Sequence, residues 1–229
     1  MTRYFTDATF AFLEDLADHN ERDWFKANQE RFEKHVREPA LAFIEDAGAP
    51  LMKVSPHLVA DPRKVGGSLF RIQRDTRFGK DKTPYKTHVG IQFRHVATMD
   101  DVHAPGLYLH IDPAGSYAGG GLWRPATADA YAIRQAIADD PAGWKKAAYA
   151  KRFTDTFTLT DHDRLVRVPK GFDPEHPYVD DIRRKDFTAG ARLTKTSVTS
   201  TTFLADYLAM VRTARPFLAF LCDAVGVAF

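Results

Sequence analysis

The chain has 229 residues, a formal net charge of +2 and 44% apolar residues. This composition is that of an ordinary globular protein, and it excludes collagen-like, low-complexity and strongly charged disordered chains. The single cysteine, Cys222, lies in the apolar run FLAFLCDAV, which predicts a buried thiol. No signal peptide or membrane-spanning run is apparent, so we expect a soluble, cytoplasmic protein without a membrane partner.

The first third of the chain predicts helices. Apolar residues recur three to four positions apart over residues 10–16, 24–36 and 39–51. Thr6 and Asn20 are the expected N-caps of the first two helices, and a proline opens the third.

The hydrophobic period then changes to two. From His88 to Arg94 apolar and polar residues alternate without exception, which is typical of a strand with one buried face. Residues 69–73 and 107–112 alternate in a similar way, and residues 115–122 form a fourth candidate strand. The short connections between these segments favour an antiparallel sheet.

Helical and strand patterns mix in the remainder of the chain. Helices are expected at residues 128–138, 144–153, 177–185 and 201–225, the last kinked at Pro216, and strands at residues 165–168 and 187–193. We therefore predict an α+β fold, a mainly antiparallel sheet packed against N-terminal and C-terminal helices, forming a single domain over residues 1–229.

Positive charge is concentrated in one segment, the basic block, which runs from Arg63 to Arg94. Residues 63–95 hold nine basic and two acidic side chains, whereas residues 1–62 hold seven and twelve, and residues 96–229 hold sixteen of each. Such an excess creates a potential that attracts anions.

The centre of the basic block reads FRIQRDTRFGKDKTPYK, Phe70 to Lys86. Guanidinium groups grip phosphate or carboxylate bidentately, and lysines add less directional charge. Residues 74–85, which we call the basic loop, are expected to form a loop between two strands, although the spacing of the arginines also permits a short helix. The alternative is a solvated loop whose Asp75 and Asp81 pair with neighbouring cations. The candidate anion-binding residues are Arg71, Arg74, Arg77, Lys80, Lys82 and Lys86.

Strand alternation predicts which polar side chains share a face of the sheet. If Val89, Ile91 and Phe93 face the core, the neighbouring polar residues face away from it. In a suitable register they form one polar face, which is either a site beside the basic loop or the wet side of an antiparallel sheet. Its members would be Arg71, Gln73, His88, Gln92, Arg94, Tyr108 and His110.

Further residues could complete such a site. The glycines Gly119, Gly120 and Gly121 would let a ligand approach the backbone, although a bulge or hairpin explains them equally well. Three aromatic residues would pack on the organic part of a ligand, and three titratable residues could exchange protons. The aromatic candidates are Tyr85, Tyr108 and Trp123, and the catalytic candidates are Asp75, His88 and His110.

Several established motifs are missing from the sequence. There is no H-E-x-x-H, C-x-x-C or G-x-S-x-G motif, and no glycine-rich nucleotide cradle with the required spacing. The sequence therefore predicts neither a metal site nor a cofactor.

Five motifs carry a family resemblance. They are N-x-R-x-W-F at residues 20–25, the central segment at residues 70–86, G-G-G-x-W-x-P at residues 119–125, R-x-P-K-G-F at residues 167–172 and K-D-F at residues 185–187. With them the chain resembles a widespread, mainly bacterial family of uncharacterised proteins, a conserved domain of unknown function. The resemblance implies that the basic block is a family signature, and it implies no substrate or cofactor.

Three functional hypotheses follow. The first is a binding or catalytic site for a phosphorylated or carboxylated small molecule. The second is nucleic-acid binding, with the basic loop on phosphates and Phe78, Tyr85 or Trp123 stacked on bases. The third is a structural or protein-interaction domain whose arginines and aspartates pair with one another.

Overall fold

The computed structural model describes residues 2–77, 80–101 and 103–229. Its strands are β1 (Leu58–Val59), β2 (Val89–His95), β3 (Gly106–Ile111), β4 (Ser116–Leu122), β5 (Thr158–Leu159) and β6 (Phe187–Leu193). They form a sheet in the order β1-β2-β3-β4-β6-β5, in which each neighbouring pair is antiparallel.

Helices precede, interrupt and follow the sheet. They are α1 (Asp7–Asp18), α2 (Arg22–Ala27), α3 (Gln29–Phe32), the π-helix η1 (Glu33–Arg37), α4 (Glu38–Met52), the 3₁₀ helix η2 (Val96–Thr98), α5 (Thr127–Asp139), α6 (Pro141–Ala148), α7 (Lys151–Thr154), α8 (Val179–Ile182), α9 (Lys195–Val198) and α10 (Phe203–Ala224). The predicted α+β class is confirmed. None of the helices in the described part of the chain combines the length and the apolar character that crossing a membrane requires.

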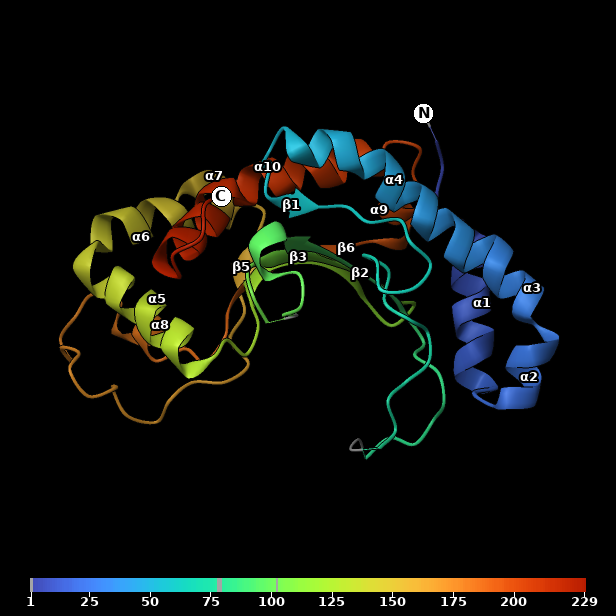
Figure 1. Ribbon diagram of the computed structural model, residues 1–229, viewed down its shortest axis with the longest axis horizontal. Helices are drawn as coiled ribbons and strands as arrows, with labels where there is room; N and C mark the ends of the chain where they lie inside the picture. Colours follow the sequence, from blue (N-terminus) through green and yellow to red (C-terminus); the bar gives the residue numbers. More distant parts are fainter. Residues whose placement is uncertain (1, 78–79, 102) are drawn as a thin grey trace.

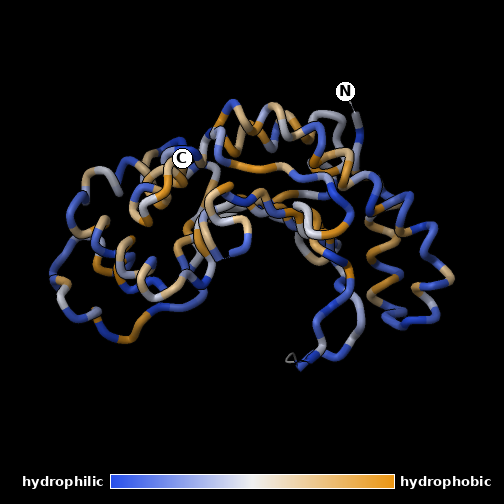
Figure 2. Tube along the Cα trace, viewed as in Figure 1, coloured by the Kyte–Doolittle hydropathy of each residue, from blue (hydrophilic) through white to orange (hydrophobic). Residues whose placement is uncertain are grey.

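One face of the sheet lies beneath α4 and α10 (Figure 1), which contact β2 and β4 respectively. Ile91, Phe93, Leu109 and Ile111 are fully buried on this face, as the alternation of β2 and β3 predicts. Figure 2 shows apolar segments, coloured orange, both in these two helices and in the sheet beneath them. Among the residues that the structure describes, no helix covers the opposite face of the sheet in the same way.

The second and third predicted helices are joined. α3, η1 and α4 follow one another without a break from Gln29 to Met52. Pro39 has no N–H to donate to the carbonyl of His35, and its ring crowds that group, so the π-helical turn just before it is a common way to accommodate a proline. The predicted N-cap Thr6 is confirmed for α1, whereas the N-cap position of α2 is held by Glu21 instead of Asn20, without a capping hydrogen bond from its side chain.

Other boundaries differ from the sequence-based expectations. Residues 69–73 make only isolated bridges, Leu69 with Ile91 and Gln73 with Tyr85, and they do not form a full strand. The strand predicted at residues 165–168 is absent from the described structure. The carbonyl groups of Leu165 and Val166 accept hydrogen bonds from the Arg183 side chain instead of from a neighbouring strand. The helix predicted at residues 177–185 is shortened to α8, and the one at residues 144–153 is divided between α6 and α7.

Candidate functional site

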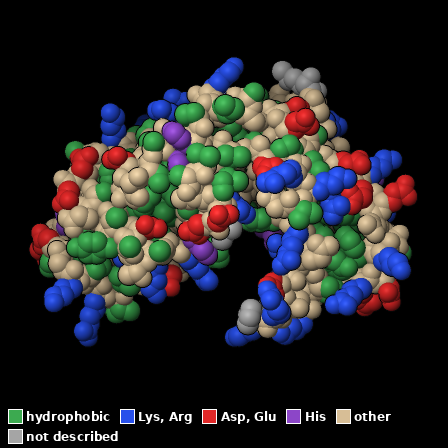
Figure 3. Space-filling model, in the orientation of Figure 1, with side chains coloured by type: hydrophobic (Ala, Val, Ile, Leu, Met, Phe, Trp, Pro, Cys, Tyr) green, Lys and Arg blue, Asp and Glu red, His purple; other side chains and the backbone are tan. Residues whose placement is uncertain are grey.

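The sheet face that points away from α4 and α10 carries polar side chains, and we call it the polar face. Its register is set by β2, β3 and β4: Gln92 lies opposite Tyr108, and His110 lies between Gly90 and Tyr117. Figure 3 shows that the molecule is hollowed on the corresponding side, between the lobe that contains α5 and the projecting basic loop. The predicted strand alternation therefore brings Tyr108 and His110 to one surface with Gln92.

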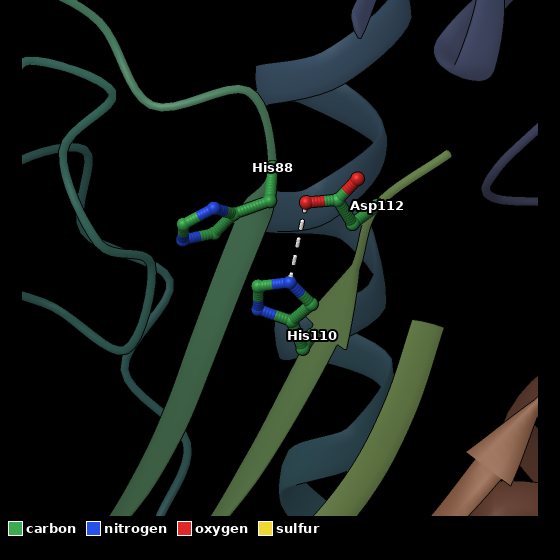
Figure 4. A group of neighbouring side chains, drawn as sticks. All are labelled: His88, His110 and Asp112. Atoms are coloured by element: carbon green, nitrogen blue, oxygen red, sulfur yellow. Dashed lines mark ion pairs between the residues drawn. The ribbon is translucent and has the colours of Figure 1, made fainter. Parts of the chain in front are cut away.

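Two histidines and an aspartate meet at one end of the polar face (Figure 4). His88 precedes β2, His110 lies in β3 and Asp112 follows β3. The His110 Nε2 atom is 3.4 Å from Asp112 Oδ2, and the rings of His88 and His110 are 4.2 Å apart between centroids. One potential ligand atom from each of the three residues lies within 4.8 Å of the others, a grouping that can hold a metal ion.

Burial sets the charge state of these side chains. Burial, the larger cause, and the neighbouring His110 together lower the pKa of His88 to about 4. Burial also lowers the pKa of His110, although Asp112 opposes this effect. Both imidazoles are therefore neutral at pH 7, and each keeps one nitrogen lone pair that can accept a proton or bind a metal ion.

Aromatic side chains hold His110 in place. The Tyr108 hydroxyl is 3.2 Å from His110 Nδ1, and the Tyr117 ring stacks on the imidazole at 4.7 Å. Tyr108 in turn lies across Gly90, where an added Cβ would be 2.8 Å from the Tyr108 hydroxyl and 3.0 Å from Phe70. This glycine near the start of β2 thus makes room for two aromatic rings on the polar face.

Lys86 connects the polar face to the basic block. Its ammonium group donates a hydrogen bond to the Arg71 carbonyl at 3.1 Å and lies 5.3 Å from the centre of the Phe70 ring, which itself contacts Tyr108. Burial lowers the pKa of Lys86, and the positive charges of Arg71 and Arg74 lower it further. Within the described residues this half-buried ammonium group has no ion pair.

Two of the predicted anion-binding arginines pair with acids of their own loop. Arg77 forms a bidentate contact with Asp75, and Arg74 reaches Asp81 at 3.2 Å. Arg74 also donates to the carbonyl of Tyr85, while its Nε is buried and has no partner among the described residues. The ion pairs of Asp75 and Asp81 are those that the third hypothesis, a structural or protein-interaction domain, predicts. Arg74 nevertheless keeps one N–H donor without a partner among the described residues.

Asp75 does not join the histidines. Its hydrogen bonds with Arg77 hold its pKa far below the usual range, so this carboxylate is a poor proton acceptor at neutral pH. Lys80 and Lys82 are exposed on the same loop, and Lys82 donates to the carbonyl of Thr76. Phe78, a candidate for base stacking, lies outside the described residues.

Tyr85 has a different position from the one expected of a ligand-packing residue. It is only 9% exposed, and its ring stacks on Phe25 of α2 at 4.1 Å. Residues 72–74 and 84–86 lie side by side at the base of the loop, where the Arg74 N–H donates to the Pro84 carbonyl and the Lys86 N–H donates to the Ile72 carbonyl, and we call this pair of segments the ribbon. Tyr85 therefore anchors this ribbon to the N-terminal helices.

Trp123 and the triple glycine lie toward the opposite end of the strands from His88. Trp123 is 49% exposed, its ring stacks on that of His103, and the Arg124 guanidinium carbon lies 4.8 Å from its centre. Gly119 pairs with Tyr108 and so belongs to the polar face, whereas a Cβ at Gly120 would meet Leu107 and Leu218 of the core. Gly121 has φ +124°, and a Cβ there would lie 2.1 Å from the Phe187 carbonyl oxygen, so glycine is required by the backbone.

Sequence reasoning identifies His88 and His110 as site candidates and misses Asp112. The aspartate follows the alternating segment directly and belongs to no motif. Its proximity to His88 depends on the register in which Val89 pairs with Ile111. The sequence contains one signal for the pairing of His110 with Asp112. The carboxylate stands two residues after the histidine, and residues i and i+2 of a strand share a face.

A second basic hollow lies away from the polar face, where α7, α10 and the C-terminal end of α4 meet. It is lined by Pro50, Lys53, Val54, Arg152, Arg212 and Arg215. All four cations are exposed, and Arg215 donates to the carbonyl of Val54. This hollow was not apparent from the sequence, because its cations come from distant segments.

The chain is thus an α+β protein with an antiparallel sheet, one face of which is buried under helices while the other carries a histidine-rich polar surface. Residues 8–220 match the family described as conserved hypothetical protein (DUF2461), and the chain belongs to this family. The resemblance inferred from the motifs is confirmed at that level. Comparison with curated proteins and with solved structures finds no match.

Proposed function

We propose that the polar face and the adjoining part of the basic block bind a phosphorylated or carboxylated small molecule, in the reducing environment of the cytoplasm. The observation that carries this proposal is Lys86, a half-buried cation between Arg71 and Arg74 without an ion pair among the described residues. Burying a charge beside like charges costs stability, and a bound anion would offset that cost.

The residues around Lys86 fit this role. Arg74 has an unpartnered, buried Nε, and Arg71 adds an exposed guanidinium group. Tyr108 and His110 would contact the organic part of the ligand from the sheet. The neutral imidazoles of His110 and His88 could also accept a proton, which makes them the candidate catalytic residues if the ligand reacts.

The test is calorimetric titration with inorganic phosphate, citrate and a panel of phosphorylated metabolites, using wild type, Arg74→Ala and Arg152→Ala. The last variant removes a matched charge from the second basic hollow. We expect saturable binding of at least one anion, weakened by Arg74→Ala and unchanged by Arg152→Ala. Absence of saturable binding, or an equal loss in both variants, would refute the proposal.

Nucleic-acid binding is a second candidate because the basic loop projects from the body of the molecule (Figure 1) and exposes Arg77, Lys80 and Lys82. Affinity for single- and double-stranded oligonucleotides at several salt concentrations separates the two functions. Contacts with phosphates predict a log–log salt slope of about −0.7 to −0.9 per contact. A flat response excludes this alternative and leaves the small-molecule proposal intact.

A further inference from the structure

The group formed by His88, His110 and Asp112 goes beyond anion binding. Zn²⁺ ligand atoms lie about 2.0 Å from the metal and therefore about 3.3 Å from one another in a tetrahedral site. The His110 Nε2 and Asp112 Oδ2 atoms are already 3.4 Å apart, and His88 brings a third ligand atom into a group no wider than 4.8 Å. We propose that these three residues bind a divalent first-row transition-metal ion such as Zn²⁺.

The donor set suits such an ion. Two imidazole nitrogens and one carboxylate oxygen match the borderline-soft transition metals better than Mg²⁺ or Ca²⁺, which prefer oxygen ligands. Three protein ligands leave at least one coordination position for water or a bound molecule, as in catalytic zinc sites. That position would open onto the polar face, because His110 and its cross-strand neighbours belong to it.

The surroundings of His110 provide the outer contact that metal-bound histidines need. With a metal ion on Nε2, the proton resides on Nδ1, and this N–H can donate to the Tyr108 hydroxyl oxygen at 3.2 Å. Tyr117, stacked on the imidazole, limits rotation of the ring.

The positive side chains near the proposed metal site disfavour the binding of a metal ion, and they also belong to the proposed anion site. The positive charges of Lys86 and Arg74 both act on His88, and Asp112 is the one carboxylate in the group. A bound anion would neutralise these cations and could also occupy the open position on the metal. Metal and anion should therefore bind cooperatively, which is the part of the inference that rests on the proposed function.

The metal site can be tested without any anionic ligand. Tag-free protein is dialysed free of metal and titrated with Co²⁺, whose visible d–d absorption reports coordination by nitrogen and oxygen ligands, and then with Zn²⁺ as competitor. We expect one equivalent per chain for wild type and for His162→Ala, a control that removes an exposed histidine. His110→Ala and Asp112→Asn should lose the absorption, and Tyr108→Phe should weaken binding about 10- to 100-fold.

Thermal unfolding of each metal-free variant verifies that it is folded. Wild-type protein that gives no Co²⁺ absorption, or a signal that survives in folded His110→Ala, would overturn the metal proposal. The anion titration described above, carried out on metal-free protein, reports on the anion site separately. Failure of either experiment therefore leaves the other proposal standing.

Discussion

The side-chain amide of Asn20 bonds both backbone groups of Tyr85. Asn20 Nδ2 donates to the Tyr85 carbonyl at 3.0 Å, and the Tyr85 N–H donates to Asn20 Oδ1 at 3.0 Å. The Asn20 amide thus satisfies both backbone groups of Tyr85, as a neighbouring strand would do in a sheet. Because Phe25 stacks on the Tyr85 ring, residues from both ends of the N-x-R-x-W-F motif hold the base of the basic loop.

Asn20→Ala should destabilise the protein by about 1–3 kcal/mol, since two partly buried backbone groups lose their partners. Hydrogen exchange at the Tyr85 amide should accelerate more than exchange in the core of the sheet. Asn28→Ala is the matched control, because the Asn28 amide donates to the carbonyl of Trp24 within the same helical region. Equal protection of Tyr85 in both variants would contradict the role assigned to Asn20.

Lys86→Met should weaken anion binding about tenfold, the value of one charge-assisted hydrogen bond, without lowering thermal stability. The substitution keeps the aliphatic stem and removes a charge that burial and Arg71 and Arg74 disfavour. Calorimetry and thermal unfolding measure the two effects. Lys151→Met, which removes an exposed lysine paired with Asp155, should leave anion affinity unchanged. Marked destabilisation by Lys86→Met would instead indicate a structural role.

Gly90→Ala should destabilise the protein by about 1–3 kcal/mol, because its methyl group would collide with Tyr108 and Phe70. The displaced Tyr108 would lose its contact with His110, so metal affinity should fall as well. Gly190→Ala is the control: its methyl group would meet only the Ala118 carbonyl oxygen, at 3.9 Å. Denaturant unfolding of both variants provides the comparison, and similar stabilities would show that Tyr108 adapts freely.

Asp181→Ala should cost about 3–5 kcal/mol of stability, because it leaves the buried guanidinium group of Arg184 without its carboxylate. Asp181 also accepts hydrogen bonds from Trp144 at 2.8 Å and Tyr149 at 2.6 Å. In contrast, Asp161→Ala breaks a more exposed pair and should cost far less stability. Chemical denaturation distinguishes the two. Equal losses would mean that the buried network contributes little.

Local patterns predicted the regular parts of the fold. Alternation in β2 and β3 gave the correct buried face, because a half-buried strand imposes period two on its own residues. β1 and β5 have two residues each and carry no periodic signal. The joining of α3 to α4 was missed because Pro39 suggested a helix start, whereas the helix continues through a π-helical turn.

The candidate site was predicted only in part for a related reason. His88, Tyr108 and His110 belong to alternating segments, so their common face followed from the period once an antiparallel pairing was assumed. Asp112 and the Asn20–Tyr85 contact depend on register and long-range packing, which no local pattern encodes. The packing of Tyr85 on Phe25 was not foreseen, because Tyr85 stands in a highly charged segment and Phe25 is 60 positions earlier in the chain.

A side chain at position 190 would have free space around it, because an added Cβ meets only the Ala118 carbonyl oxygen at 3.9 Å. This position is therefore a practical attachment point for a reporter group. Gly190 lies across from Gly119, which pairs with Tyr108, so a side chain introduced there would emerge on the polar face. The natural thiol of Cys222 is 1% exposed, and burial raises its pKa to about 12, so it should resist alkylation. A fluorophore attached at Gly190→Cys would therefore label one defined place, beside the surface on which ligands are expected to arrive.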